Sequence, residues 1–222
     1  MIRFENVTKR YATAGQVKTV VEGLTLEVPS GRAVGLLGRN GAGKSTLLKM
    51  VSGAVLPTSG RIVTTGLVSW PVGFAGSFHP DLTGLQNCRF VARIYGVDTH
   101  ELADFVEKFA GLGMHFRLPL RTYSSGMKSR LAFGVSMGIH FDTYLVDEIT
   151  AVGDAAFRER SDRLFKARLR NAGAVVCSHS MPQLRMLCDC GIVLDEGRAL
   201  FFDTIDAAIA QHQENMARLA AA

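Results

Sequence analysis

The stretch Gly38–Ser45 fits, without a mismatch, the pattern G-x-x-x-x-G-K-[ST] that holds nucleotide phosphates. Its glycines leave the backbone free to turn its N–H groups toward phosphate oxygens. Lys44 supplies a positive charge for the β- and γ-phosphates, and the Ser45 hydroxyl is a ligand for Mg²⁺. The sequence therefore predicts a nucleoside triphosphate site. Its expected residues are Gly38, Arg39, Asn40, Gly41, Ala42, Gly43, Lys44, Ser45 and Thr46.

Two acids follow an apolar run further along the chain, where Tyr144–Val146 leads into Asp147 and Glu148. The first acid suits Mg²⁺, bound directly or through water. The second can orient or deprotonate an attacking water. The alternative is an acidic pair that only solvates the turn after a strand. Its position downstream of a phosphate loop favours a role in triphosphate hydrolysis.

Three smaller features add candidate contacts to phosphate and base. Ser124–Gly126 precede a helix, where free N–H groups attract an anion, although such residues also serve as an ordinary N-cap. His179 follows an apolar strand and is a candidate γ-phosphate contact, the alternative being a structural histidine. Tyr11 could stack on a purine or pack against the core.

The elements that must position these residues alternate between strands and helices. Arg32–Leu37 reads as a buried strand and Lys44–Ser52 as a helix, so the loop has the context that such a motif needs. Alternation of this kind favours an α/β fold with a mostly parallel sheet. The other expected strands are Ile2–Val7, Leu24–Val28, Arg61–Thr65, Thr143–Val146, Ala174–Cys177, Ile192–Leu194 and Ala199–Phe202. The other expected helices are Leu82–Tyr95, His100–Ala110, Lys128–His140, Asp154–Arg170 and Asp206–Ala220.

Composition narrows the class of protein. The chain has 222 residues, 47% of them hydrophobic, and a net charge of +5. No run approaches the roughly 18–20 apolar residues that span a bilayer, and no apolar leader opens the chain, so a cytosolic location is expected. The basic residues concentrate in 158–170 with acids between them and no aromatic stacking pattern. This favours a solvated helix face, then anionic lipid, over nucleic acid.

Taken in order, these motifs resemble those of the nucleotide-binding subunits of ABC transporters, over essentially the whole chain. The resemblance identifies Gly38–Ser45 as the Walker A loop and Ser124–Gly126 as the signature motif. Leu145–Asp147 is similar to Walker B. The single-residue roles that it implies are catalytic Glu148, a D-loop that ends at Asp154, the switch histidine His179 and the adenine-stacking Tyr11.

The resemblance also implies a fold and a chemistry. The fold is an α/β P-loop NTPase core of the ABC ATPase type, with an antiparallel β lobe and an inserted α-helical subdomain. One ABC ATPase domain would span 1–222, with 1–72 and 129–222 as catalytic core and 73–128 as helical subdomain. The activity is hydrolysis of ATP with Mg²⁺. Lys44, Glu148 and His179 are implied as catalytic residues, and Ser45 and Asp147 as metal ligands.

Two departures from the family pattern narrow the subfamily. Tyr123–Met127 reads Tyr-Ser-Ser-Gly-Met where the family usually has Leu-Ser-Gly-Gly-Gln, and the Q-loop glutamine expected near Phe74 or Ala75 is missing. Together with Trp70–Phe74 and Leu82–Gly84, these features resemble the polysaccharide and O-antigen exporters of Gram-negative bacteria, capsule exporters above all.

Partners follow from the same resemblance. Two copies are expected to form a homodimer around ATP, and the helical subdomain, especially Phe74–Leu82, is expected to contact a separate membrane permease. The protein would be peripheral on the cytoplasmic face of the inner membrane, powering polysaccharide export without nucleic acid. The alternatives are an importer, another exporter, or a soluble ABC ATPase of DNA repair or translation. A P-loop kinase would leave Tyr123–Met127 unexplained.

Overall fold

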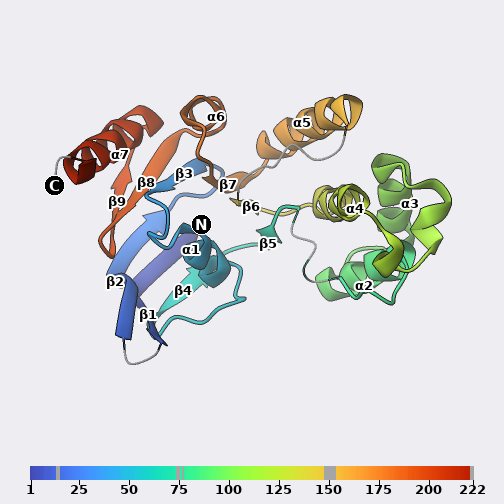
Figure 1. Cartoon of the computed structure of the whole chain (residues 1–222), viewed down its shortest axis with the longest axis horizontal. Coiled ribbons are helices and arrows are strands. Elements are labelled where there is room, and N and C mark those ends of the chain that lie inside the picture. Colours follow the sequence, from blue (N-terminus) through green and yellow to red (C-terminus); the bar gives the residue numbers. More distant parts are fainter. Residues whose placement is uncertain (14–15, 74–75, 77, 148–153, 221–222) are drawn as a thin grey trace. The chain divides into compact units, whose positions relative to one another are not determined.

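The computed structural model describes residues 1–13, 16–73, 76, 78–147 and 154–220. They fall into two compact units, each described by itself below (Figure 1). The first unit comprises Met1–Pro71, Phe141–Glu148 and Asn171–Ala222, and the second comprises Val72–His140 and Ile149–Arg170. No helix in the described part of the chain is both long enough and apolar enough to cross a membrane.

The first unit contains an antiparallel three-stranded sheet in the order β2-β1-β4. Its strands are β1 (Ile2–Thr13), β2 (Gln16–Val28) and β4 (Ser59–Thr64). β1 and β2 extend well beyond the expected strands Ile2–Val7 and Leu24–Val28, because the two strands pair continuously from Ile2 opposite Val28 to Thr13 opposite Gln16, with bulges between. The expected antiparallel lobe is confirmed.

The larger sheet of this unit has six strands in the order β5-β6-β7-β3-β8-β9. All neighbouring pairs are parallel except β8 with β9. Central strands are buried on both faces, as the continuous apolar runs indicate. The mostly parallel sheet is therefore confirmed. The strands are β3 (Ala33–Gly38), β5 (Val68–Pro71), β6 (Thr143–Asp147), β7 (Gly173–Cys177), β8 (Cys190–Asp195) and β9 (Arg198–Phe202).

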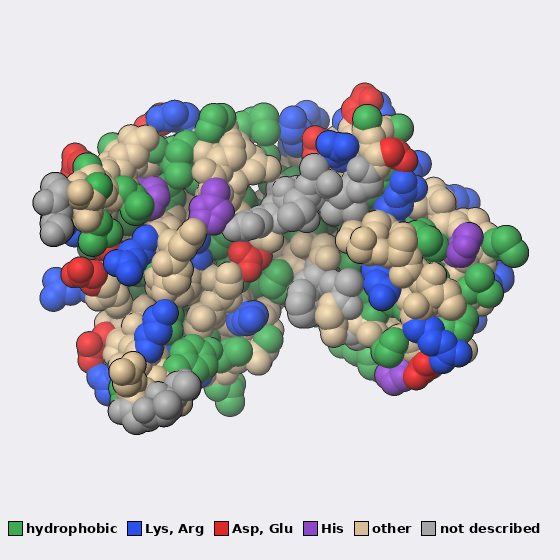
Figure 2. All heavy atoms as spheres, viewed as in Figure 1, with side chains coloured by type: hydrophobic (Ala, Val, Ile, Leu, Met, Phe, Trp, Pro, Cys, Tyr) green, Lys and Arg blue, Asp and Glu red, His purple; other side chains and the backbone are tan. Residues whose placement is uncertain are grey.

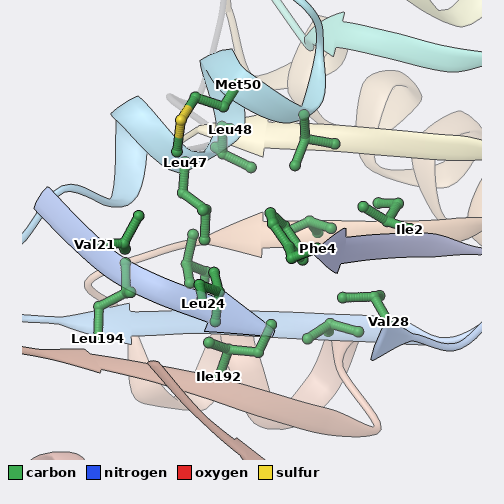
Figure 3. Packing of buried hydrophobic residues seen from close by; sticks show 14 of the residues in the cluster. Ile2, Phe4, Val21, Leu24, Val28, Leu47, Leu48, Met50, Ile192 and Leu194 are labelled. Carbon is green, nitrogen blue, oxygen red and sulfur yellow. The ribbon is translucent and has the colours of Figure 1, made fainter. Parts of the chain in front are cut away.

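Three helices complete the first unit: α1 (Lys44–Val51), α6 (Met181–Leu187) and α7 (Ile205–Ala220). Leu47, Leu48 and Met50 of α1 point into a core shared with both sheets, as Figure 3 shows. Phe4 of β1 and Ile192 of β8 contribute to the same cluster. This core fixes the start of α1 against the two sheets, and the phosphate loop directly precedes that start.

The second unit is helical. Its helices are α2 (Gly84–Tyr95), α3 (Thr99–Ala110), α4 (Ser125–Gly138) and α5 (Ala155–Leu169), with short 3₁₀ turns at Gly113–Arg117 and Leu120–Thr122. Aromatic rings of Phe109, Phe133 and Phe157 pack together and join α3, α4 and α5. The second unit therefore contains the expected subdomain 73–128 together with the rest of α4 and with α5. From the sequence, residues 129–222 were expected to belong to the catalytic core. The boundaries of the subdomain stay a prediction.

Charged side chains cover α5 with both signs interspersed (Figure 2). The helix buries only Phe157, Ser161 and Phe165, and Arg163 lies within 3.8 Å of Glu159 one turn earlier. This arrangement is typical of a solvated helix face.

The strand β5 and the helix α6 were not predicted, and α4 begins three residues earlier than expected. β5 has only four residues and includes Pro71, and α6 has seven with Pro182 in its first turn, so neither carries a periodic pattern. α4 begins at Ser125 instead of Lys128, because the Ser124 side chain caps it by accepting a hydrogen bond from the Met127 N–H.

Candidate functional site

The phosphate loop leaves the middle of the larger sheet at the end of β3. All six residues of β3 are buried, and its neighbours are β7 and β8. Gly38, the last of them, pairs with Leu194 and has φ 152°. A Cβ at this position would lie 2.7 Å from the Leu194 carbonyl oxygen, so only glycine lets the loop turn away here.

The loop ends at Gly43, the N-cap of α1. Its φ of 108° is left-handed, and a Cβ there would lie 2.2 Å from Val20 Cγ1. No side chain caps the helix. Because the first N–H groups of a helix have no partner within it, this start is suited to phosphate oxygens.

Lys44 lies at the first position of α1, and its ammonium turns back over the loop. Nζ donates to the carbonyl oxygen of Gly38 at 2.7 Å and to that of Arg39 at 3.1 Å. The loop's own carbonyls therefore hold the ammonium beside the N–H groups that face a phosphate.

A cavity of about 450 Å³ opens over the loop. It brings together many of the residues predicted from sequence, and two further residues, Lys18 and Val20, that were not predicted. Gly38, Arg39 and Ala42 belong to the same loop but do not line the cavity. The predicted residues that line it are Tyr11, Asn40, Gly41, Gly43, Lys44, Ser45, Thr46, Asp147 and His179.

Asp147 and His179 reach the cavity from neighbouring strand ends. Asp147 ends β6 and pairs with Cys177, the last residue of β7. The Ser178 hydroxyl donates to Gln183 Oε1 and accepts from the Ser180 N–H, which fixes the turn that carries His179 into α6. Carboxyl ends of parallel strands are where open α/β sheets bind ligands. Glu148, the predicted catalytic base, lies outside the described residues, as do Phe74 and Ala75 of the predicted Q-loop.

The oxygen donors at this edge suit Mg²⁺. The Ser45 hydroxyl and the Asp147 carboxylate line the same cavity as the loop, and hard oxygen ligands of this kind are those that Mg²⁺ uses next to phosphates. The donor set therefore fits the ion that the motifs imply.

Tyr11 lies on the cavity wall with 40% of its surface exposed. The ring is therefore not part of the buried core. Lys9 Nζ lies 4.7 Å from the centroid of the ring and also donates to the carbonyl oxygen of Leu56 at 2.8 Å. The stacking of Tyr11 on a purine stays a prediction.

Lys18 and Val20 were missed because the sequence placed a strand only at Leu24–Val28. No local pattern marks them, because β2 reaches back to Gln16 only through its pairing with β1. Tyr11 is directly opposite Lys18 in that pairing, so these two side chains lie side by side on the cavity wall.

The signature residues lie in the second unit, at the start of α4. Ser124 is the N-cap, and Ser125 and Gly126 form the first turn. The preceding Tyr123 is buried, and its hydroxyl donates to the His115 carbonyl oxygen at 2.5 Å. This anchor fixes the point at which α4 begins.

Asp154 lies at the start of α5 in the same unit. Its Oδ1 accepts from the Phe157 N–H at 2.8 Å, and its Oδ2 lies 2.6 Å from the guanidinium of Arg130 on α4. The Phe157 N–H first, and the Arg130 guanidinium after it, hold the pKa of Asp154 below its usual value. Arg130 also lies 5.1 Å from the Phe157 ring centroid. These contacts join the signature helix to the end of the predicted D-loop.

Comparison with known proteins places this geometry in a family. Residues 21–151 match the family model described as ABC transporter. The chain is 46% identical over 216 residues to a polysialic acid transport ATP-binding protein, KpsT, of Escherichia coli, with 96% of each chain covered. It is 43% identical to the capsule polysaccharide export ATP-binding protein CtrD of Neisseria meningitidis serogroup B, covering 94% of this chain and 96% of CtrD.

The fold agrees with a solved structure as well. An ATP-binding cassette, determined as a dimer in a post-hydrolysis state bound to ADP and Pi, superposes with a TM-score of 0.74 at 22% identity. The match covers 90% of this chain and 98% of that one. The expected fold, an α/β P-loop ATPase core of the ABC type, is thereby confirmed.

Proposed function

Because this chain belongs to the ABC transporter family and carries its nucleotide-binding ATPase domain, we propose that it powers export of a capsule-type polysaccharide across the inner membrane through a separate permease. One observation carries the proposal. Relatives more than 40% identical over nearly the whole chain are named for transport of polysialic acid or export of capsule polysaccharide. Similarity over that length includes both the cavity and the helical unit, which is where a partner would bind.

At the cavity, each residue type suits one part of Mg²⁺-ATP. Tyr11 stacks on the adenine, residues 38–46 hold the phosphates, and Ser45 and Asp147 hold the ion. When bound, Mg²⁺ neutralises charge on the β- and γ-phosphates. Glu148 accepts a proton from the attacking water. His179 donates to the γ-phosphate.

The signature acts on a second copy of the chain. Ser124–Gly126 form a helix start suited to an anion, as the start of α1 does, and one γ-phosphate needs both. In a head-to-tail dimer, the signature and Asp154 of one copy face the phosphates held by the other. The solved cassette bound to ADP and Pi is dimeric, which supports this arrangement. Closure on ATP and release after hydrolysis then drive transport.

The helical subdomain, proposed as 73–128, contacts the permease and so holds the protein at the cytoplasmic face of the membrane. Of the described residues in 74–82, Phe78 is buried, whereas His79, Pro80 and Asp81 are exposed. One turn apart on α2, Phe90 and Ile94 expose 51% and 61% of their surface. Exposed apolar side chains at this spacing suit a protein partner.

A photo-crosslinking residue at Phe90 or His79 tests the permease contact. We expect either to attach to an integral membrane protein in intact cells, and the purified pair to hydrolyse ATP faster than the ATPase alone. The control is the same crosslinker at Glu159, an exposed position on α5. Crosslinks only to cytosolic proteins, or stimulation by nucleic acid in place of the permease, would place the chain among the soluble ABC ATPases.

A further inference from the structure

A lysine outside the phosphate loop lies on the wall of the nucleotide cavity. Lys18 is on β2, directly opposite Tyr11 of β1 in the antiparallel pair. Cross-strand partners point to the same face of a sheet, so Tyr11 and Lys18 lie side by side. Both side chains line the cavity, and so does Val20, which lies at a bulge of β2.

Two residues of β2, Lys18 and Val20, lie close to glycines of the phosphate loop. Val20 contacts Gly43 so closely that a Cβ there would lie 2.2 Å from Val20 Cγ1. Two residues earlier on both segments, a Cβ at Gly41 would lie 3.8 Å from Lys18 Nζ. The Lys18 ammonium is thus beside the part of the loop whose backbone N–H groups face phosphate oxygens.

The charge of Lys18 is available to a ligand. Among the described residues, no acceptor or acid forms a hydrogen bond or ion pair with its ammonium, whereas Lys44 is held by two loop carbonyls and Lys9 by the Leu56 carbonyl. The side chain is exposed at the cavity rim. An unpaired ammonium at such a rim is suited to a phosphate oxygen.

We propose that Lys18 is a second phosphate-binding cation, which contacts the α- or β-phosphate of the nucleotide. The inference rests on the proposed use of this cavity for ATP. Lys18 lies between Tyr11, the proposed base contact, and Gly41 of the loop, and such loops cradle the α- and β-phosphates. Because ATP and ADP share those phosphates, Lys18 strengthens the binding of both alike, and its contact is the same before and after hydrolysis.

Titration of Lys18→Gln with ATP, ADP and adenosine tests this role. We expect ATP and ADP to bind about 5- to 10-fold more weakly, since one charged hydrogen bond is lost at a partly exposed site. Adenosine affinity stays at the wild-type value. The loss shrinks as salt is raised, and Lys18→Arg restores the affinity for ATP and ADP.

Lys49→Gln is the matched control, because it removes the same charge from an exposed position of α1 outside the cavity. Wild-type affinity of Lys18→Gln for ATP and ADP, or a loss no larger than that of Lys49→Gln, overturns the inference. So does an equal loss for adenosine, which would assign Lys18 to the base. A wild-type protein that binds neither ATP nor ADP would instead contradict the proposed function itself.

Discussion

Replacing Glu148 by Gln is expected to lower ATP turnover by about 10²- to 10⁴-fold, the usual contribution of a general base. The amide keeps the shape of the side chain but cannot accept a proton from the attacking water. ATP affinity is expected to stay at the wild-type value, because the loop, Lys44 and Ser45 are untouched. The measurement is phosphate release at saturating Mg²⁺-ATP, together with a nucleotide titration of the same protein.

Glu159→Gln is the control for this change, since it removes an equal charge from the exposed face of α5. Turnover of Glu148→Gln within a few-fold of wild type would show that another group activates the water. A parallel loss of ATP affinity would mean that Glu148 holds the nucleotide or its ion, and the role of base would then be withdrawn.

Lys44→Ala is expected to weaken ATP binding by about 10- to 100-fold, because hydrogen bonds to charged groups contribute about 1.5–3 kcal/mol. Unlike Glu148→Gln, this change acts on binding itself. Lys44 also donates to the Gly38 and Arg39 carbonyls, so the loop loses two internal contacts. Thermal unfolding of the variant without nucleotide measures that structural part separately.

Lys49→Ala, on the exposed face of the same helix, provides the control for net charge and helix propensity. If Lys44→Ala retained wild-type affinity for ATP, the assignment of Gly38–Ser45 as the phosphate loop would be wrong.

The parts of this site that could be predicted are those marked by a pattern in the neighbouring sequence. The strand, loop and helix around Gly38–Ser45 were predicted because each has a strong local cause, namely a buried apolar run, glycines with positive φ and a helix opening at Lys44. Asp147 and His179 were predicted because apolar strands end beside them.

Lys18 shows what local patterns leave out. Its strand carries polar residues at its start, so apolar alternation predicts only the segment near Leu24, and pairing with β1 extends the strand to Gln16. The start of α4 was misplaced for a similar reason. Apolar periodicity begins late in that helix, and the Ser124 cap sets its first turn.

The central claim is that each ATP site combines the loop of one copy with the signature of another. Two inactive variants test it. Lys44→Ala disables the loop, and Ser125→Glu places a negative charge at the exposed start of α4, where an acid favours the helix but repels phosphate. In a mixed dimer, the changed loop of one copy faces the changed signature of the other, so both defects lie in one site. The second site combines an unchanged loop with an unchanged signature and is intact.

ATPase activity of the two variants, measured separately and as an equimolar mixture, is the most direct test. Each variant alone is expected to be nearly inactive. The mixture is expected to recover about a quarter of wild-type activity, since half of randomly formed dimers are mixed and each has one intact site of two. A mixture no more active than the two variants measured separately would contradict the composite site, because an intact loop and an intact signature on different copies would then fail to complement each other.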